Sequence, residues 1–349
     1  MTNTASARVL VTGATGFVGS ALAARLAVQG AQVFGLSRKP QPQGRGGIEW
    51  LTGNVEDAVA LAEISRGMDV VFHVGGMVGH FGSHDEYMRA NVEGTRNVIA
   101  ACRANGIETL VFTSTPSVIA DGTGHFGVDE AHPYSTRFQS PYSESKALAE
   151  QVVRAANRDG LRTVSIRPHM IWGPGPSHWV GGLKKLARGG MLYQIGSGTN
   201  RIGMTFIDDC VDAHIAAWHA VEADESVGGE SFFVHGGSPV YLWEWVRDLT
   251  AALGLPPIKG KLPKSAAAFG GNVCDFIARL SGGSLHFPIS RYLVTELTTD
   301  HYSSIDRARA MLGYSPKITV SEGIARMAEA ERAAHGAAAL QQTVPLLHP

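Results

Sequence analysis

A tyrosine and a lysine, four positions apart, are the side chains with the clearest chemical potential in this sequence of 349 residues. Tyr142 and Lys146 would share one face of a helix, because residues at this spacing lie about one turn apart. Hydride transfer to a carbonyl creates an alkoxide, and a tyrosine can protonate it if its pKa falls from about 10 toward neutrality. A lysine ammonium about 5 Å away would lower that pKa by roughly two units. We therefore predict that Tyr142 donates the proton, assisted by Lys146.

Hydroxyl side chains end an apolar run at 109–114 that predicts a strand. Thr115 is the first candidate, and Ser114 the second, for a group that hydrogen-bonds the substrate oxygen and stabilises its developing charge. Either hydroxyl could instead cap nearby backbone, as hydroxyl side chains often do.

A glycine-rich segment joins an apolar run at 8–12 to a helix-like stretch at 18–29. Gly13 would permit the tight turn, Gly16 would let the backbone approach a pyrophosphate, and Gly19 would let the helix pack closely on the strand. The helix N-terminus would offer free N–H groups to the phosphates. A plain strand-to-helix turn is the alternative. The residues predicted to bind a dinucleotide here are Gly13, Thr15, Gly16, Phe17, Val18 and Gly19.

The residues after the second predicted strand, at 32–36, bear on the choice of cofactor. NAD enzymes usually place a carboxylate there for the ribose 2′-hydroxyl, whereas this chain has Ser37, Arg38 and Lys39. No carboxylate appears before Glu49. A hydroxyl and two cations suit a 2′-phosphate, since a guanidinium binds phosphate through a planar fork. We predict NADP(H) rather than NAD(H); a solvated basic turn is the alternative.

Residues after the third and fourth predicted strands would lie beside the same cofactor. Asn54 and Val55 would flank the adenine. The small residues that follow His73 would let the backbone pass close to the cofactor at Gly75. We interpret His73 as a hydrogen-bonding residue beside the cofactor rather than a metal ligand. We predict no metal site, because no set of ligands has a suitable spacing.

The elements that would position these residues alternate between strand and helix through the first two-thirds of the chain. Continuous apolar strands between helices indicate a parallel sheet covered on both faces. Such sheets bind ligands at the carboxyl ends of their strands. We predict an α/β fold, with a Rossmann-type doubly wound parallel sheet as the NADP-binding domain over 1–170, to which 204–236 returns. A smaller C-terminal α+β substrate lobe would span 171–335, followed by a tail at 336–349.

Composition limits the class of protein further. Hydrophobic residues make up 44% and charged residues 17%, so the chain can form a sizeable core. The 30 Lys and Arg nearly balance the 31 Asp and Glu, which does not favour nucleic-acid binding. The sequence contains no run of 18 apolar residues, so it predicts no membrane span. A strand pattern that begins at Arg8 leaves no room for a signal peptide. Three separated cysteines indicate a reducing, cytoplasmic compartment.

A set of short motifs extends these interpretations. They are GATGFVG, NVEGTRN, STP, YSESK and RP, which begin at Gly13, Asn91, Ser114, Tyr142 and Arg167. Together they resemble the extended short-chain dehydrogenase/reductase family. The segments IRPHMIWGPG, TFIDDCVDAH and HYSSIDRARAMLGYSP further resemble its 3β-hydroxysteroid dehydrogenase group. That group includes sterol-4α-carboxylate 3-dehydrogenases and 2-alkyl-3-oxoalkanoate reductases, and the similarity runs from about residue 8 to about residue 330.

The resemblance implies a Ser/Thr-Tyr-Lys catalytic set, which maps onto Thr115, Tyr142 and Lys146. It also implies that Asn91 supports the lysine side of the site and that Pro168 borders the nicotinamide. The steroid enzymes often favour NAD, and the basic residues after the second strand depart from that pattern. This departure fits the reductase branch better.

Three functions remain open at this point. The first is an NAD(P)-dependent reductase or dehydrogenase acting at the 3-position of a small apolar 3-oxo or 3-hydroxy acid or sterol-like substrate. The second is a nucleotide-sugar epimerase or dehydratase, which typically carries Asn-Val-Tyr-Gly-Pro where this chain has MIWGP at 170–174. The third is a non-catalytic NADP-binding regulator, which would not need Tyr142 or Lys146. The resemblance also implies a homodimer formed through helices near 85–104 and 142–157.

Overall fold

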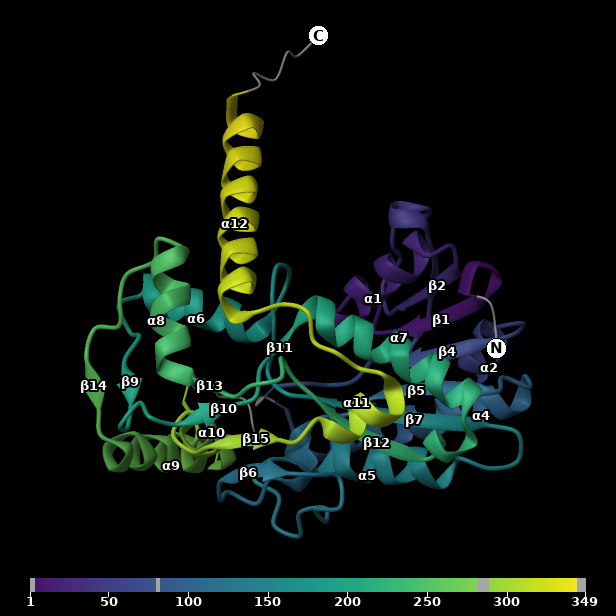
Figure 1. Ribbon diagram of the computed structural model, residues 1–349, viewed down its shortest axis with the longest axis horizontal. Coiled ribbons are helices and arrows are strands. Elements are labelled where there is room, and N and C mark those ends of the chain that lie inside the picture. The colour runs from purple at the N-terminus through teal and green to yellow at the C-terminus, as the bar shows by residue number, and fades with distance from the viewer. Residues whose placement is uncertain (1–3, 80–81, 281–288, 344–349) are drawn as a thin grey trace.

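A seven-stranded parallel sheet forms the centre of this computed structural model, which describes residues 4–79, 82–280 and 289–343. The strands lie in the order β12-β7-β5-β4-β1-β2-β3, and all neighbouring pairs run parallel (Figure 1). They are β1 (Arg8–Thr12), β2 (Gln32–Ser37), β3 (Ile48–Thr52), β4 (Val70–His73), β5 (Thr109–Thr113), β7 (Arg162–Pro168) and β12 (Glu230–Val234). The predicted Rossmann-type fold is confirmed.

Helices cover both faces of this sheet, which is why its strands are apolar on both sides. One face carries α1 (Phe17–Val28), α7 (Ile207–Ala223) and α11 (Asp306–Leu312). The other face carries α2 (Ala58–Ile64), α4 (Gly94–Ala104) and α5 (Pro141–Ala155). Successive strand residues point to opposite faces, so Val9 joins the first core and Leu10 joins the second.

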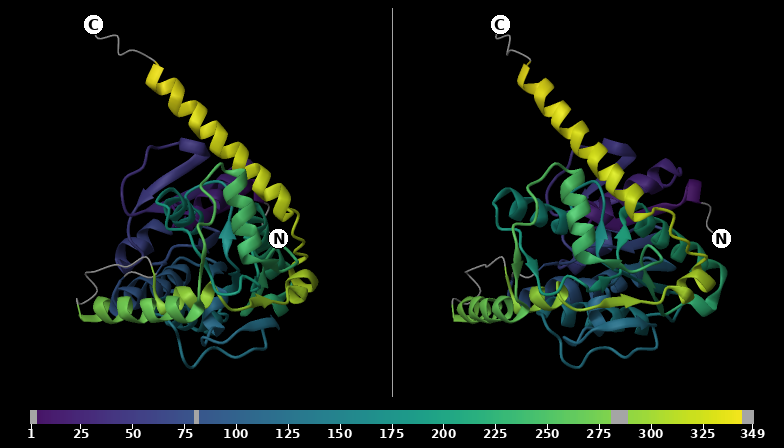
Figure 2. Two further views of the ribbon diagram at one scale, coloured as in Figure 1. Left: turned by 90° about the vertical axis from the view of Figure 1, so that its left-hand side faces the viewer. Right: turned by 60° about the vertical axis from the view of Figure 1, so that its left-hand side comes forward.

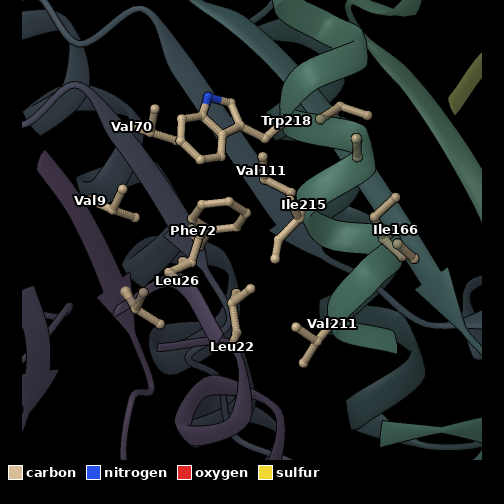
Figure 3. Close-up of a cluster of buried hydrophobic side chains, with 14 of the residues drawn as sticks. Val9, Leu22, Leu26, Val70, Phe72, Val111, Ile166, Val211, Ile215 and Trp218 are labelled. Atoms are coloured by element: carbon tan, nitrogen blue, oxygen red, sulfur yellow. The ribbon is translucent and has the colours of Figure 1, made fainter. Parts of the chain in front are cut away.

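Figure 3 shows the first of these two cores. Phe72 from β4 meets Trp218 from α7 edge-on, with ring centroids 5.8 Å apart. Leu22 and Leu26 of α1 lie in the same cluster and are fully buried. This packing holds α1, and therefore the glycine loop that precedes it, against the sheet.

From β1 the chain first builds one half of the sheet, with β2 and β3, and then returns to build the other half, beginning with β4. The strand order therefore reverses at β1, which lies between β2 and β4. A ligand crevice forms at such a point, outside the carboxyl ends of the two strands. Gly13 follows β1 with a φ of 67°, and a Cβ there would come 2.6 Å from Cα of Gly75, which follows β4. The two loops that border the crevice therefore approach one another as closely as glycine allows.

A smaller lobe has its own hydrophobic core, which includes Trp172, Phe206, Trp243 and Trp245. Its short sheets have the orders β13-β10-β15-β6, β11-β8 and β14-β9. Their strands are β6 (His125–Val128), β8 (Ile171–Trp172), β9 (Gln194–Ile195), β10 (Arg201–Ile202), β11 (Thr205–Phe206), β13 (Val240–Tyr241), β14 (Lys261–Leu262) and β15 (His301–Ser303). The helices of this lobe are α6 (His178–Arg188), α8 (Leu242–Ala252), α9 (Lys264–Leu280), α10 (Arg291–Glu296) and α12 (Val320–Thr343).

The region for which the sequence predicts one helix, at 85–104, contains three helical segments. They are α3 (His84–Tyr87), a π-helical segment (Met88–Glu93) and α4. π-Helical turns are rare and often mark functional sites. Here the turn carries Asn91.

Helix α12 projects from the body of the molecule in every view (Figures 1 and 2) and continues to Thr343. It therefore extends into the range 336–349 that the sequence predicts as a tail, because the alanine-rich stretch there favours helix; residues 344–349 lie outside the described part. Within the described residues, no helix is long and apolar enough to cross a bilayer. Short 3₁₀ segments are η1 (Thr4–Ser6), η2 (Arg45–Gly47), η4 (Pro116–Ile119) and η5 (Glu225–Val227).

Candidate active site

The start of helix α5 places the predicted proton donor. Ser140 caps the helix, its Oγ accepting a hydrogen bond from the Ser143 backbone N–H at 3.2 Å. Pro141 occupies the first turn, where its fixed φ favours helix and its missing N–H costs nothing. Tyr142 follows directly, and its side chain faces the Thr115 hydroxyl at the end of β5. The structure therefore brings together two of the three predicted catalytic side chains.

The pKa of Tyr142 differs from the sequence-based prediction. Burial raises it to about 12, although the nearby Thr115 hydroxyl acts to lower it. The ring of Tyr87, with its centroid 6.3 Å away, contributes to the raised value. The lowering expected from Lys146 is not seen in the chain by itself, because loss of hydration dominates for a buried phenol.

Lys146 lies one turn further along α5 and is buried, with an exposed fraction of 5%. Its Nζ donates a hydrogen bond to the Thr113 carbonyl at 2.6 Å and lies 4.0 Å from the centroid of the Phe112 ring. Burial lowers the pKa of Lys146 to about 7, and the Glu150 carboxylate partly opposes this shift. Near neutral pH, Lys146 is therefore close to the midpoint of its titration.

The two hydroxyl candidates at the end of β5 point to different neighbours. Thr115 faces Tyr142 and also caps η4, accepting a hydrogen bond from Ser117 N at 3.3 Å. Ser114 is buried beside the Glu150 carboxylate, and its hydroxyl forms no hydrogen bond of good geometry within the described part of the chain. Of the two, only Thr115 lies where it can act with Tyr142.

A buried histidine links the two strands that border the crevice. His73 Nδ1 lies 2.7 Å from Thr12 Oγ1, and its Nε2 lies 3.0 Å from Thr95 Oγ1. Burial, aided by the charge of Lys146, lowers the pKa of His73 to about 3, so the ring is neutral. Thr95 donates its own proton to the Asn91 carbonyl at 2.5 Å, which makes Nε2 the protonated nitrogen. On the other side, Thr12 Oγ1 accepts the Gly75 N–H at 3.0 Å.

Asn91 extends this network to helix α5. Its side chain holds the backbone of Met77 through Oδ1 at 2.7 Å and Nδ2 at 3.0 Å. The same Nδ2 donates to Ser145 Oγ at 2.9 Å, and Ser145 donates to the Tyr142 carbonyl at 2.9 Å. Asn91 therefore joins the loop after β4 to the turn of α5 that carries Tyr142 and Lys146.

The glycine loop leaves the first turn of α1 free of side-chain caps. Gly16 is the N-cap residue, and it has no side chain to hydrogen-bond the N–H groups that follow it. A Cβ at Gly19 would come 2.2 Å from the Gly13 carbonyl oxygen, so helix and loop need glycine there. Thr15 is exposed, Phe17 is half-buried, and Val18 is buried in the core of the smaller lobe. Free N–H groups at a helix start suit a pyrophosphate, so these residues fit a dinucleotide.

Some side chains that follow β2 and β3 hydrogen-bond or pack within the chain, and others are exposed to solvent. Ser37 Oγ donates to the Lys39 carbonyl at 2.7 Å and so shapes its own turn. Arg38 and Lys39 are exposed, and within the described ranges neither pairs with a carboxylate. Asn54 Oδ1 accepts the N–H of residue 56 at 3.2 Å, and Val55 packs against the start of α4. Two cations are therefore available beside the crevice.

Pro168 is the last residue of β7 and is buried there. It pairs in register with Val234 of β12. The position predicted to border the nicotinamide thus lies at a carboxyl end of the same sheet, together with Thr115 and His73.

Comparison with known families supplies the class of enzyme. Residues 10–264 match the model of the 3-beta hydroxysteroid dehydrogenase/isomerase family. The chain belongs to this family. The resemblance to the extended short-chain dehydrogenases predicted from the sequence is confirmed, and this member is an NAD(P)-dependent oxidoreductase of the type that acts on alcohol and carbonyl groups.

Relatives of this dehydrogenase cover nearly the whole chain. The 2-alkyl-3-oxoalkanoate reductase of Stenotrophomonas maltophilia (strain K279a) is 40% identical over 327 residues, spanning 92% of this chain and 98% of the relative. The 3 beta-hydroxysteroid dehydrogenase/Delta 5-->4-isomerase of Mycobacterium tuberculosis (strain ATCC 25618 / H37Rv) is 31% identical over 338 residues, spanning 91% and 88%. Among solved structures, MoeE5 in complex with UDP-glucose and NAD has a TM-score of 0.73 at 25% identity, over 94% of this chain and 99% of that one.

Two tyrosines that the sequence analysis missed lie beside Tyr142 in this dehydrogenase. Tyr87 of α3 stacks edge-on against it and donates a hydrogen bond to the Gly79 carbonyl at 2.8 Å. Tyr292 of α10 hydrogen-bonds Ser143, and its pKa is raised well above the usual value by burial and by nearby Glu296 and Tyr142. Helix α10 is short and lies far along the chain, so no local pattern could have revealed this contact.

Proposed function

We propose that this dehydrogenase uses NADP(H) to transfer hydride at the 3-position of a 3-oxo or 3-hydroxy acid or a sterol-like substrate, with Tyr142 as acid and base. The observation that carries the proposal is the approach of the Thr115 hydroxyl to Tyr142, one turn from buried Lys146 and at the carboxyl edge of the sheet. A buried lysine with few partners is costly in stability and is typical of functional sites.

The chain's own residues account for proton transfer. At neutral pH, Tyr142 is protonated, because burial raises its pKa to about 12, and it can donate to an alkoxide. Thr115 would hold the substrate oxygen in line with the phenol. NADP(H), when bound, supplies or accepts the hydride. Lys146 would hold the ribose hydroxyls and stabilise the tyrosinate left after donation, which its charge favours.

The exposed pair Arg38 and Lys39 supports NADP(H) over NAD(H). A 2′-phosphate at the end of β2 would find two cations that no carboxylate occupies in the described part of the chain. We expect Arg38→Ala to raise the KM for NADPH at least about tenfold, because the loss of a charge-assisted hydrogen bond weakens binding by about this factor. The KM for NADH should stay unchanged. Steady-state kinetics with both cofactors tests this, and equal effects on both would contradict the NADP assignment.

The name of the Stenotrophomonas relative, which matches across almost its full length, supports a 2-alkyl-3-oxo acid as substrate. A sterol-like alcohol is the second candidate, supported by the family match. The deciding experiment measures NADPH and NADH consumption in parallel with a long-chain 2-alkyl-3-oxo acid. NADPH-selective turnover supports the proposal. Oxidation of a 3β-hydroxysteroid with NAD, without turnover of the oxo acid, would place the enzyme in the steroid branch instead.

The role of Tyr142 needs its own variant. We expect Tyr142→Phe to lower kcat/KM by at least about 100-fold, because the proton donor is lost. Tyr241→Phe is a suitable control, since Tyr241 is exposed in β13. A Tyr142→Phe enzyme with the activity of the control would refute the proposed mechanism. A tightly retained cofactor without net redox turnover would instead favour an epimerase.

We also infer a homodimer formed through the outer faces of α4 and α5, as is usual for the family. Leu148 on α5 is 38% exposed, which suits such a contact. Leu148→Arg should therefore yield a monomer in analytical ultracentrifugation. A cytoplasmic location is supported by the three cysteines, all free thiols.

A further inference from the structure

Tyr87 of α3 contacts both the proposed proton donor and the loop that follows β4. Tyr87 is 1% exposed, and its ring centroid lies 6.3 Å from that of Tyr142, with the two ring planes at 64°. Its hydroxyl donates a hydrogen bond to the Gly79 carbonyl oxygen at 2.8 Å. One buried side chain therefore links the phenol that would donate the proton to the loop beside it.

The helical segments around Tyr87 fix its direction. Helix α3 begins with a capping box, in which Ser83 Oγ accepts the Glu86 N–H at 3.3 Å and the Glu86 carboxylate accepts the Ser83 N–H at 2.8 Å. The π-helical segment begins at the residue after Tyr87. Tyr87 and Asn91 are four positions apart, so they lie about one turn apart on the same face. Both side chains contact the loop after β4, so this face is turned toward the site.

The loop after β4, at 74–79, has three glycines among its six residues. Glycine loses more conformational freedom on folding than any other residue, so this loop needs contacts that hold it in one conformation. Asn91 holds Met77 through the backbone N–H at 2.7 Å and the carbonyl at 3.0 Å. The Tyr87 hydroxyl holds Gly79, whose φ is 106°. Tyr87 therefore fixes the part of the loop that lies furthest along the chain from β4.

The phenol of Tyr142 must keep one orientation if it is to donate a proton to the substrate oxygen. The backbone of Tyr142 is held by Ser145, whose hydroxyl donates to the Tyr142 carbonyl at 2.9 Å. The Thr115 hydroxyl and the ring of Tyr87 approach its side chain. Aromatic rings that meet edge-on attract one another, and a misplacement of about 1 Å can slow a reaction about 100-fold. Tyr87 therefore contacts the group whose placement matters most for the rate.

Two other roles fit Tyr87 less well. As a second proton donor, it would have to break the hydrogen bond to the Gly79 carbonyl, and burial raises the pKa of Tyr87 further above neutrality. As a residue of the main core, it would pack with the apolar side chains on one face of the sheet. In the described part of the chain, the clusters on these two faces do not include Tyr87. Its contacts lie with the site instead.

We propose that Tyr87 is a positioning residue: its ring orients the phenol of Tyr142, and its hydroxyl holds the loop after β4 beside the crevice. This inference rests on the proposed function, in which Tyr142 is the acid and base. Loss of the ring would disturb proton transfer, so it should slow the chemical step. Loss of the hydroxyl alone would loosen the loop and leave the phenol in place, so it should act on the KM for the substrate.

Single-turnover oxidation of NADPH by a 2-alkyl-3-oxo acid separates these two effects, because it follows the chemical step without product release. If the enzyme turns over only a 3β-hydroxysteroid, the same variants are compared in that direction. We expect Tyr87→Leu to lower the single-turnover rate at least about tenfold. Tyr87→Phe should keep this rate within about twofold of the wild type and raise the KM for the substrate about threefold.

The matched control is Tyr314→Leu. Tyr314 is also buried, with 3% exposed, and its hydroxyl likewise donates to a backbone carbonyl, that of His235, at 3.0 Å. It packs in the core on the α7 face of the sheet. This variant should lose stability in urea denaturation and keep the single-turnover rate of the wild type, which separates a general loss of packing from a loss of positioning.

A double variant tests whether Tyr87 acts through the phenol. If it does, adding Tyr87→Leu to Tyr142→Phe should lower the rate no further, because the group that Tyr87 orients is already gone. If the two losses multiply instead, Tyr87 acts separately from Tyr142, and the positioning role is wrong.

Failure of this inference would look different from failure of the proposed function. If Tyr142→Phe keeps the activity of its own control, the proposed mechanism is wrong, whatever Tyr87 does. If Tyr142→Phe is impaired but Tyr87→Leu reacts at the wild-type rate, only the positioning role is overturned. A Tyr87→Phe protein that is as slow as Tyr87→Leu would also overturn it. Tyr87→Met, whose flexible side chain fills the same space, replaces Tyr87→Leu if that variant does not fold.

Discussion

Helix α5 buries two charged side chains one turn apart, and the surroundings of these two charges differ. Glu150 is completely buried and faces Arg167, whose Nε and Nη2 lie 2.9 and 2.5 Å from its two oxygens. Tyr134 and Ser231 donate two further hydrogen bonds to it, at 2.7 and 2.9 Å. Among the residues that the structure describes, Lys146 has only a carbonyl oxygen and the face of Phe112 as close partners.

The two pKa values record this difference. Burial acts to raise the pKa of Glu150, but Arg167 and the hydrogen-bond donors outweigh it, and the net shift is downward. Burial lowers the pKa of Lys146 to about 7, and Glu150 offsets it only in part. A well-paired buried charge can anchor β7 and α5 to each other, whereas a poorly paired one is costly and is typical of functional sites. In this comparison, Glu150 has the surroundings of a structural anchor, whereas Lys146 has those typical of a functional site.

The largest change in the free energy of unfolding should follow from breaking the buried ion pair between Glu150 and Arg167. Glu150→Gln leaves the Arg167 guanidinium buried without its counter-charge, and we expect it to lower the free energy of unfolding by about 4 kcal/mol. Urea denaturation measures this. Glu93→Gln is the control, because Glu93 pairs with Arg96 on the surface, with side chains 54% exposed, and its loss should cost at most about 0.5 kcal/mol. Similar losses for both variants would show that the buried pair is not an anchor.

Removing the charge of Lys146, which is poorly paired, should raise the free energy of unfolding rather than lower it. We expect Lys146→Met to abolish catalysis and to raise the free energy of unfolding by about 3 kcal/mol at pH 6. Lys146 has a pKa of about 7 in the fold against 10.5 as its ordinary value, so burial costs most below pH 7, where both states are charged. From pH 7 to 10.5 the unfolded chain binds the extra proton, and wild-type stability rises.

The gain from Lys146→Met should therefore shrink as pH rises through that window and vanish above it. Urea denaturation at pH 6, 8 and 10 follows this trend. Exposed Lys39→Met should show no such dependence. A destabilised Lys146→Met protein at pH 6 would refute the view that this lysine is held at a cost.

The smallest effect concerns the neutral network beside Lys146. Thr95→Val would leave His73 Nε2–H and one hydrogen-bonding site of the Asn91 carbonyl without their partner, at a cost of about 1–2 kcal/mol in unfolding free energy. Thr95→Ser keeps the hydroxyl and should lose less. A Thr95→Val protein as stable as the wild type would show that these hydrogen bonds contribute little to the stability of the fold.

Local patterns in the sequence were sufficient for the framework of this protein. The alternation of apolar strands with helices predicts the sheet, because a strand buried on both faces needs apolar residues throughout. The spacing of Tyr142 and Lys146 predicts a shared helix face, because it matches the turn of a helix. The uncapped start of α1 follows from Gly16, which has no side chain to offer.

Only the tertiary structure decided how these residues behave. It placed Tyr292 beside Ser143, joined Thr12, His73 and Thr95 in one network, and separated the neighbours Ser114 and Thr115. The direction of the Tyr142 pKa shift was also beyond the sequence, because the cost of burial depends on everything packed around the phenol. Spacing along the chain determines which residues share a turn of helix. Contacts between distant segments, and the loss of water that comes with them, arise only when the chain folds.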